Sequence, residues 1–449
     1  MGGMPEAGVY IGQVIFCCML VALTIAGSDS IGGAGIQADI RAMASQGVHA
    51  AVALTAVTAQ NTTRVSGIFP LPAEEVVAQL DAVLEDVHVS AAKTGMLFSA
   101  GIASAVADRL DGEKFPLVVD PVMVAGVGDA LNRDDLIGAL RDRILPMATM
   151  LTPNVPEAEA LVGYRIDDQT DVRRACRELA GMGAEAVLLK GGHMETNDCT
   201  DTLFHDGKFL SMSFPRVNVR GHGGGCILSS YLAANLAKGH GIWESALMAR
   251  TAIDESISAR YVIGRGVPLV EPLGAKLRDA QRYEVLSRLR NTALKVESAL
   301  ERLSSPETLE IYFALPGAES AKDVGSVAVM PSEKGGVGCG SFGASEASNR
   351  SALAAVCLDG RMRAGAKVRL TDERARAIRA SDLTSRVVRA GRRPPSVAGT
   401  GAESALVHLG FVPDVVIDRG GGGREAAVWL FARTPEELLG KLMVALGRG

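Results

Sequence analysis

Two glycine-rich runs combine residue types that handle phosphate. The first, KGGH, begins at Lys190 after the apolar residues AVLL, and the second, HGGGC, opens an apolar stretch typical of a buried helix. Glycines at the start of a helix present backbone N–H groups at its positive end, where anionic oxygens bind. We therefore predict that Gly223, Gly224 and Gly225 form an anion site. Cys226 follows in the same turn, where a thiolate is stabilised and its pKa lowered.

This arrangement predicts phosphoryl transfer. Cys226 would accept the proton of a substrate hydroxyl as its oxygen attacks a phosphate, and Lys190 would supply positive charge to the transferred group. Both residues also have structural interpretations, because a cysteine packs as a small apolar side chain and a lysine is commonly a solvated surface residue.

Two acidic residues add a candidate metal site. Asp120 ends the run VVD, and Glu157 lies in NVPE after another short apolar run. Two carboxylates beside a phosphate site hold Mg²⁺ together with water and phosphate oxygens. The same NxxE pattern fits a helix N-cap box, so the pattern alone leaves both roles open.

Polar side chains after two strand-like runs indicate a site for a heterocycle. The turn AGSDSIGGAG leads into a stretch that carries Asp39, and Gln60 ends HAAVALTAVTAQ. An amide offers a donor and an acceptor to a ring edge, and Met96 in KTGM offers a flexible apolar wall. The first turn has neither the Walker ending nor the dinucleotide spacing. A purely turn-forming role remains an alternative for these segments.

The elements that would position these residues alternate along the chain up to about residue 265. Short continuous apolar runs at 21–26, 116–119 and 186–189 predict strands buried on both faces. Amphipathic stretches predict helices between them, at 72–86, 134–144, 168–182 and 243–260. The alternation indicates an α/β fold with a mainly parallel sheet flanked by helices, which binds ligands at the carboxyl ends of its strands.

The length of 449 residues exceeds one domain. The net charge of −5 is uneven, since the chain is basic from residue 276 and acidic before it, which predicts two units with different ligands. We expect a helix at 277–303 and a mixed α/β pattern after it. The predicted organisation is an extension at 1–20, a first domain at 21–265, a linker at 266–279 and a second, smaller α/β domain at 280–449.

Composition excludes several partners. Aromatic residues make up only 4%, and the Arg-rich stretch 372–393 alternates with acidic and apolar residues, so we predict no nucleic-acid partner. The apolar run at 14–26 has no basic residue before it and is short for a membrane span, so we predict a buried strand and no membrane partner. Seven scattered cysteines without a CxxC pair indicate a reducing, cytoplasmic location.

Seven motifs in order carry a resemblance to a known family. They read ALTIAGSDS–GGAGIQAD, TAxTAQNT, KTGM, VVDPVM, LTPNxPEAEAL, LLKGGH and GHGxGC. Over residues 21–265 the chain resembles the hydroxymethylpyrimidine/phosphomethylpyrimidine kinases of thiamine biosynthesis, which have a ribokinase-like fold. The resemblance implies that ATP and Mg²⁺ serve as cofactors and that hydroxymethylpyrimidine and its monophosphate are substrates. We also expect a homo-oligomer.

Carried over position by position, the resemblance implies a role for each candidate. Asp39 and Gln60 would read the aminopyrimidine edge. Asp120 and Glu157 would serve the Mg²⁺–ATP phosphates. The residues implied to line the pyrimidine site are Gly27, Asp39, Thr58, Gln60 and Met96, and those implied to transfer the phosphoryl group are Lys190, Gly223, Gly224, Gly225 and Cys226.

The chain departs from the family on the nucleotide side. The family usually has Thr at Gly224 and at Ile227, and an Asp at Asn218. The segment 125–130 lacks a lysine and a serine common there. These differences place ATP affinity in question more than pyrimidine recognition.

Residues 280–449 resemble the thiamine-phosphate synthase domain found fused to this kinase, mainly in archaea. The resemblance rests on YFALPGA, FGAS and PDVVIDRGGGG. It departs where the family has Ser-His after FGAS, because this chain has Glu346 and Ala347. A pyrophosphate without nearby cations is poorly stabilised, so this half is expected to bind a thiamine-type phosphate without making one. Candidate phosphate ligands are Arg350, Arg419 and Arg424.

Two other functions fit the same sequence. A pyridoxal kinase is the nearest enzyme alternative, since that family carries similar motifs. A regulatory protein with a weakened catalytic loop and a sensor domain for thiamine-pathway phosphates is an alternative from a different class.

Overall fold

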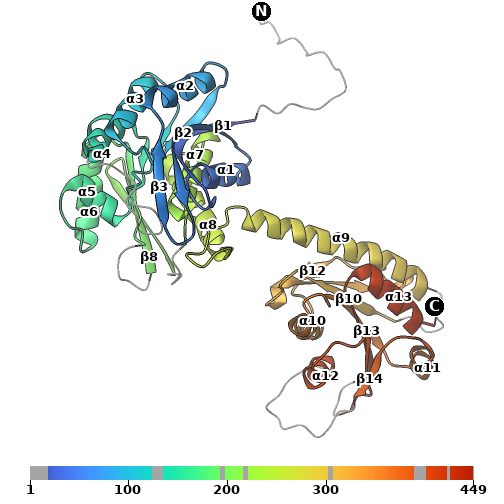
Figure 1. Ribbon diagram of the computed structural model, residues 1–449. Coiled ribbons are helices and arrows are strands. Elements are labelled where there is room, and N and C mark those ends of the chain that lie inside the picture. The colour runs from blue at the N-terminus through green and yellow to red at the C-terminus, as the bar shows by residue number, and fades with distance from the viewer. Residues whose placement is uncertain are drawn as a thin grey trace, which may run out of the picture. The chain divides into compact units, whose positions relative to one another are not determined.

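The computed structural model describes residues 19–123, 135–192, 198–215, 221–301, 307–388, 401–421 and 425–447. The chain divides after Lys276 into two compact units. The predicted linker at 266–279 spans this point and includes the start of a helix at Gly274. Each unit has its own sheet and its own hydrophobic clusters (Figure 1).

The first unit contains a nine-stranded sheet. Its strand order is β3-β2-β1-β4-β5-β6-β7-β8-β9. The six strands from β2 to β7 in that order are parallel, and β3, β8 and β9 add antiparallel edges. The strands are β1 Val21–Asp29, β2 His49–Gln60, β3 Val65–Pro70, β4 Val89–Thr94, β5 Leu117–Val119, β6 Met150–Leu151, β7 Ala186–Leu189, β8 Asp198–His205 and β9 Lys208–Pro215.

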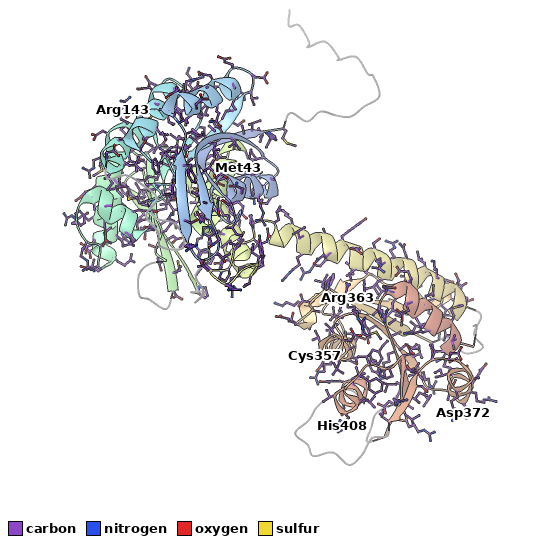
Figure 2. The ribbon with its side chains drawn as sticks, viewed as in Figure 1. Met43, Arg143, Cys357, Arg363, Asp372 and His408 are labelled. Atoms are coloured by element: carbon purple, nitrogen blue, oxygen red, sulfur yellow. The ribbon has the colours of Figure 1, made fainter. Side chains whose placement is uncertain are left out.

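Helices cover both faces of this sheet (Figure 1). Helices α1, α7 and α8 pack on one face, with Met43 of α1 fully buried there (Figure 2). Helices α2 to α6 pack on the other face, where alternate residues of β1 such as Leu23 and Ile25 point. The helices are α1 Gly35–Ser45, α2 Ala73–Leu84, α3 Ala100–Leu110, α4 Leu136–Ala139, α5 Val155–Val162, α6 Gln169–Gly181, α7 Gly224–Ala237 and α8 Ile242–Ser258.

Local signals explain where helices begin and end. The Asn154 side chain accepts from the Glu157 N–H and the Glu157 carboxylate accepts from the Asn154 N–H, both at 2.8 Å, so α5 begins with a capping box. Gly163 ends that helix at φ +83°, a conformation that glycine adopts without strain. The predicted helix at 134–144 is irregular: its described part is the short α4 followed by a π-helical turn at Leu140–Ile144.

The second unit contains a seven-stranded, mostly antiparallel sheet of order β12-β11-β10-β13-β16-β15-β14. Only the β14–β15 pair is parallel among its described strand pairs. Two hydrophobic clusters cover its two faces, one built with α9 and α13 and one with α10 and α12. Strands and helices are β10 Leu309–Ala314, β11 Val324–Val329, β12 Ser341–Phe342, β13 Ala364–Arg369, β14 Ser385–Val388, β15 Val415–Asp418, β16 Ala427–Ala432, α9 Gly274–Leu300, α10 Glu346–Leu358, α11 Asp372–Ala380, α12 Gly401–Leu409 and α13 Pro435–Ala445.

None of the helices in the described part of the chain is long and apolar enough to cross a membrane.

Candidate active site

The predicted site residues follow the carboxyl ends of the parallel strands. Asp29 and Gln60 are the last residues of β1 and β2, and Asp120 and Lys190 come directly after β5 and β7. Because parallel strands end at the same edge of a sheet, these four side chains lie along one edge.

Lys190 lies between two carboxylates. Its Nζ is 3.0 Å from Asp120 Oδ1 and 3.8 Å from Glu157 Oε2. Its side chain keeps 15% exposure, whereas Asp120 is almost fully buried. The structure therefore brings together the three charged residues predicted to handle a phosphate and its metal ion.

Burial and charge act against each other in this cluster. Burial disfavours the charged form of Lys190, but Asp120 and Glu157 outweigh it, so the pKa of Lys190 is raised. Burial and the negative charge of Asp120 raise the pKa of Glu157 to about 7, although Lys190 opposes this. Glu157 therefore changes from its protonated to its ionised form near neutral pH.

The residues of this cluster fit a magnesium ion that is shared with a nucleotide. Within the described ranges no group of three or more His, Cys, Asp or Glu side chains is placed to hold a metal by itself. Mg²⁺ characteristically takes one or two protein carboxylates and fills its other positions with water and phosphate oxygens. Asp120 and Glu157 supply that number and type of ligand.

The helix α7 begins where the sequence predicts an anion site. Gly223 precedes it at φ +91°, and a Cβ there would stand 1.7 Å from the carbonyl oxygen of Gly33. A Cβ at Gly225 would lie 3.4 Å from Lys190 Nζ and 3.6 Å from Asp120 Oδ2. The backbone N–H groups at the start of α7 therefore lie beside the cluster of Asp120, Glu157 and Lys190.

Cys226 lies in this first turn, but its predicted acidity is wrong. Burial raises the pKa of its thiol to about 11. Lys93 and the N–H of Gly35, which hydrogen-bonds to the sulfur, lower the pKa without reversing this effect. The helix N-terminus stabilises a thiolate, yet removing the sulfur from water outweighs that stabilisation here. The thiol is therefore neutral at pH 7 in the ligand-free protein.

Asp39 takes part in a fully buried ion pair that sequence reasoning missed. Lys93 Nζ lies 2.8 and 2.9 Å from its two carboxylate oxygens, and neither side chain has solvent exposure. Thr24 and Ser230 also donate to this carboxylate, at 2.6 and 2.8 Å. Burial alone would lower the pKa of Lys93, but Asp39 outweighs it and raises that pKa. Both carboxylate oxygens of Asp39 therefore already accept hydrogen bonds within the protein. Pyrimidine recognition by Asp39 stays a prediction.

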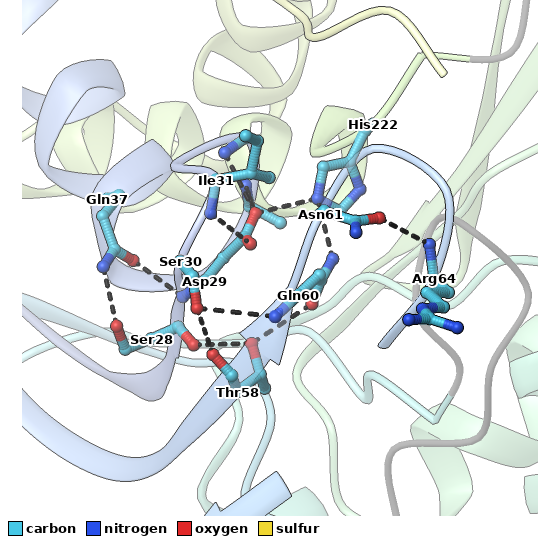
Figure 3. A network of polar contacts seen from close by, with 12 residues as sticks. Ser28, Asp29, Ser30, Ile31, Gln37, Thr58, Gln60, Asn61, Arg64 and His222 are labelled. Atoms are coloured by element: carbon cyan, nitrogen blue, oxygen red, sulfur yellow. Dashed lines mark hydrogen bonds and ion pairs between the residues drawn. The ribbon is translucent and has the colours of Figure 1, made fainter. Parts of the chain in front are cut away.

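Gln60 belongs to a polar network that joins three segments (Figure 3). Its side-chain nitrogen is 3.0 Å from Nε2 of His222, which is 2.8 Å from Asp29 Oδ2. Thr58 lies in the same network, since its hydroxyl is 3.3 Å from the Gln60 oxygen. Sequence reasoning did not single out His222 or Asp29. The available signal was their position, one at the end of a predicted strand and one directly before the glycine run.

Gly27 and Met96 face each other. A Cβ at Gly27 would stand 2.5 Å from the Met96 methyl carbon, and Met96 packs against Ala56 and Val122. Met96 therefore lies in a small apolar cluster, and glycine at position 27 gives the methionine room. Its role as an apolar wall for a pyrimidine stays a prediction.

The second unit places its candidate phosphate ligands less favourably. Arg350 pairs with Glu346 at 2.6 Å, one turn earlier on α10. Arg419 is exposed after β15, and Arg424 lies outside the described residues. Glu310 of β10 accepts from the hydroxyls of Ser345 and Ser348, both at 2.7 Å. A carboxylate therefore already accepts from both of these hydroxyls at the start of α10.

The fold and this site define a ribokinase-like small-molecule kinase. The family model of phosphomethylpyrimidine kinase matches residues 29–271, and the model of thiamine-phosphate synthase ThiN matches residues 292–443. The chain belongs to the phosphomethylpyrimidine kinase family, with a ThiN domain fused at its C-terminal side.

Relatives match mainly the first unit. The hydroxymethylpyrimidine/phosphomethylpyrimidine kinase of Streptomyces coelicolor is 43% identical over 252 residues, which cover 56% of this chain and 93% of that protein. The thiamine biosynthesis bifunctional protein ThiED of Geobacter sulfurreducens is 44% identical over 246 residues, covering 54% of this chain and 50% of that protein. An ADP complex of Bacillus subtilis pyridoxal kinase is similar in structure, with a TM-score of 0.54 and 30% sequence identity. The match covers 58% of this chain and 99% of that chain.

Gly223→Ala tests the close approach of Gly33. The added Cβ meets a carbonyl oxygen, and the residue adopts a left-handed conformation. We therefore expect the free energy of unfolding of the first unit to fall by about 1–3 kcal/mol. Gly224→Ala is the matched control, because open space surrounds its Cβ position. Calorimetric unfolding measures both. Equal stability of the two variants would contradict the geometry described here.

Asp39→Asn tests the buried ion pair. It leaves the Lys93 ammonium buried without its counter-charge, so we expect a loss of about 3–5 kcal/mol in the free energy of unfolding. Adding Lys93→Met should recover part of that loss. Asp108→Asn, which breaks the exposed pair with Arg143, should change stability by less than about 1 kcal/mol. A similarly small effect of Asp39→Asn would show that the pair is not desolvated.

Proposed function

We propose that the first unit uses ATP to phosphorylate hydroxymethylpyrimidine and then its monophosphate, in thiamine biosynthesis. The proposal rests on the geometry at the start of α7, where backbone N–H groups and Cys226 lie beside Lys190 and Asp120. Gln60 ends a strand at the same edge of the sheet. Family membership and the named activity of the 43% identical relative support the substrate class.

The proposed reaction uses positioning and charge more than covalent chemistry. The substrate hydroxyl oxygen forms a bond to the γ-phosphorus of ATP while the bond to the ADP oxygen breaks. The hydroxyl proton passes to Cys226 Sγ in the fraction of molecules in which this sulfur is a thiolate. Lys190 and the N–H groups of Gly224 and Gly225 stabilise the negative charge on the moving phosphoryl group.

Asp120 and Glu157 would hold Mg²⁺ together with the nucleotide phosphates. The ion, when bound, supplies positive charge that neutralises the phosphate oxygens. Within the protein, Asp120 also holds Lys190 in place at 3.0 Å. The ADP complex of the structurally similar pyridoxal kinase supports a nucleotide at this kind of site.

Pyridoxal is a second candidate substrate, because pyridoxal kinase has the same fold and 30% identity. A coupled assay of ADP release with hydroxymethylpyrimidine, its monophosphate and pyridoxal decides between them. We expect turnover with both pyrimidines and a kcat/KM for pyridoxal at least about tenfold lower, a difference of about 1.4 kcal/mol. Binding of the pyrimidine without ADP release would instead support the regulatory alternative.

Cys226→Ala tests the base. Because the pKa of the thiol is about 11, the reactive thiolate fraction rises about tenfold per pH unit from pH 7 upward. We expect kcat/KM of the unsubstituted protein to rise between pH 8 and 10, above the range in which Glu157 exchanges its proton.

In Cys226→Ala the rise should disappear and kcat should fall by about 10²-fold or more, while pyrimidine affinity by calorimetry changes little. Unchanged turnover, or the same pH profile without the thiol, would remove Cys226 from the mechanism.

We further propose that the ThiN domain binds thiamine phosphate without forming it. Glu346 stands where the resembling family has a serine, and it pairs with Arg350, one of the candidate phosphate ligands. The full chain, given thiazole phosphate and pyrimidine pyrophosphate, should form thiamine phosphate no faster than the uncatalysed background. Robust product formation would contradict this proposal.

Glu346→Ser removes the carboxylate that pairs with Arg350 and, with it, one negative charge that would repel a bound phosphate. A charge-assisted hydrogen bond contributes about 1.5–3 kcal/mol, so we expect thiamine phosphate to bind about tenfold more tightly in calorimetry. Glu333→Ser, which removes an exposed carboxylate outside α10, is the matched control. Equal affinities of Glu346→Ser and the unsubstituted protein would show that this ion pair does not oppose phosphate binding.

A further inference from the structure

We propose that His222 is a positioning residue that fixes the orientation of the Gln60 amide and thereby selects the hydrogen-bonding pattern of the pyrimidine edge. The inference rests on the proposed function, because it concerns how that substrate is chosen. It assigns a role to Asp29 and His222. These two residues belong neither to the predicted anion site at 223–225 nor to the cluster of Asp120, Glu157 and Lys190.

The His222 side chain is held in place on several sides. The residue is 1% exposed. Its N–H donates to Pro268 O at 2.9 Å, and its carbonyl accepts from Val270 N–H at 3.2 Å. A Cβ at Gly33 would stand 2.5 Å from its Cδ2 atom, so the first loop packs directly on the ring. The imidazole therefore has little freedom to turn.

The partners of the ring determine which nitrogen carries the proton. Nε2 lies 2.8 Å from Asp29 Oδ2, and the backbone N–H groups of Gly33 and Ala34 also donate to that oxygen. Burial raises the pKa of Asp29, but His222 and the backbone donors outweigh it, so the pKa lies below its ordinary value and the carboxylate is a pure acceptor. Nε2 must therefore donate.

The other ring nitrogen confirms this tautomer. Nδ1 of His222 is buried and has no hydrogen-bond partner among the described residues. A proton there would be a buried donor without an acceptor, which is costly. The neutral form of the ring therefore carries its proton on Nε2.

The Gln60 amide must match this donor. Its terminal position beside His222 lies 3.0 Å from Nε2, and the amide oxygen is the only end of the group that accepts from an N–H. The two ends of an amide differ little in shape, so the hydrogen-bond network decides between them. With the oxygen toward His222, the amide N–H₂ faces the Thr58 hydroxyl, which itself donates to Ser28 O at 2.9 Å. The single Nε2 proton of His222 then lies between two acceptors, Asp29 Oδ2 and the Gln60 oxygen, and the Gln60 N–H₂ has the Thr58 hydroxyl as its acceptor.

This chain of contacts fixes which end of the Gln60 amide is the acceptor and which is the donor. Asp29 orients the His222 proton, and that proton orients the Gln60 oxygen. A 4-aminopyrimidine presents a ring acceptor beside an amino donor, whereas its 4-oxo analogue presents the reverse. If the amide is fixed, it accepts one pattern and rejects the other, because the rejected pattern leaves a buried polar group unpaired.

The decisive quantity is the ratio of kcat/KM for hydroxymethylpyrimidine to kcat/KM for its 4-oxo analogue. His222→Phe keeps a ring of similar size without the donor, so the Gln60 amide is free to turn and the ratio should fall about tenfold or more. His222→Gln places an amide N–H near the Nε2 position and should retain most of the ratio, whereas His222→Asn places its amide near Nδ1 and should behave like His222→Phe.

A purely structural role predicts a different result. His222→Phe and His222→Gln would then change kcat/KM for both pyrimidines by the same factor, with no change in the ratio, and that result would overturn the proposal. Circular dichroism of each variant shows whether it is folded.

A measurement on the unsubstituted full chain keeps the test independent of turnover and of variant folding. With ¹⁵N-histidine labelling, the ring of His222 is recognised among the seven histidines by its absence in His222→Gln. We expect the Nε2–H tautomer, and an Nδ1–H tautomer would overturn the proposal. If neither pyrimidine is phosphorylated, the proposed function fails, while the tautomer still decides the arrangement of Asp29, His222 and Gln60.

Discussion

The carbonyl oxygen of Gly33 approaches the chain at Gly223 so closely that a Cβ there would stand 1.7 Å away. This contact joins the loop after β1 to the start of α7, and both sides of the candidate site depend on it. It allows His222 to reach Asp29 and Gln60, and it lets Gly35 donate to the sulfur of Cys226. A substrate bound near Gln60 therefore lies at the same edge of the sheet as the N–H groups that would hold a phosphate.

Two lysines, one buried and one partly exposed, give the site its charge balance. Lys93 is matched inside the protein by Asp39, and Lys190 is shared between Asp120 and Glu157. Their exposure differs: Lys93 has none and pairs with Asp39 inside the protein, whereas Lys190 remains partly exposed beside Gly225. Charges held in place before the substrate arrives need little reorganisation during phosphoryl transfer.

Periodicity predicted most of the first unit, because short apolar runs and amphipathic stretches directly reflect burial on two faces and on one. Chain order also predicted that Asp120, Glu157, Lys190 and the glycine run would meet, since parallel strands share an edge. It did not reveal Lys93, whose position within a strand gives no sign of a partner on α1. The pKa of Cys226 was predicted in the wrong direction, because the dipole of a helix is visible in a sequence and the depth of burial is not.

A structure of the full chain with hydroxymethylpyrimidine and a non-hydrolysable ATP analogue tests the central claim most directly. The account predicts γ-phosphate oxygens within hydrogen-bonding distance of the backbone nitrogens of Gly224, Gly225 or Cys226, with the substrate hydroxyl between that phosphate and Cys226 Sγ. A terminal phosphate bound away from the start of α7, or a pyrimidine bound away from Gln60, would contradict it.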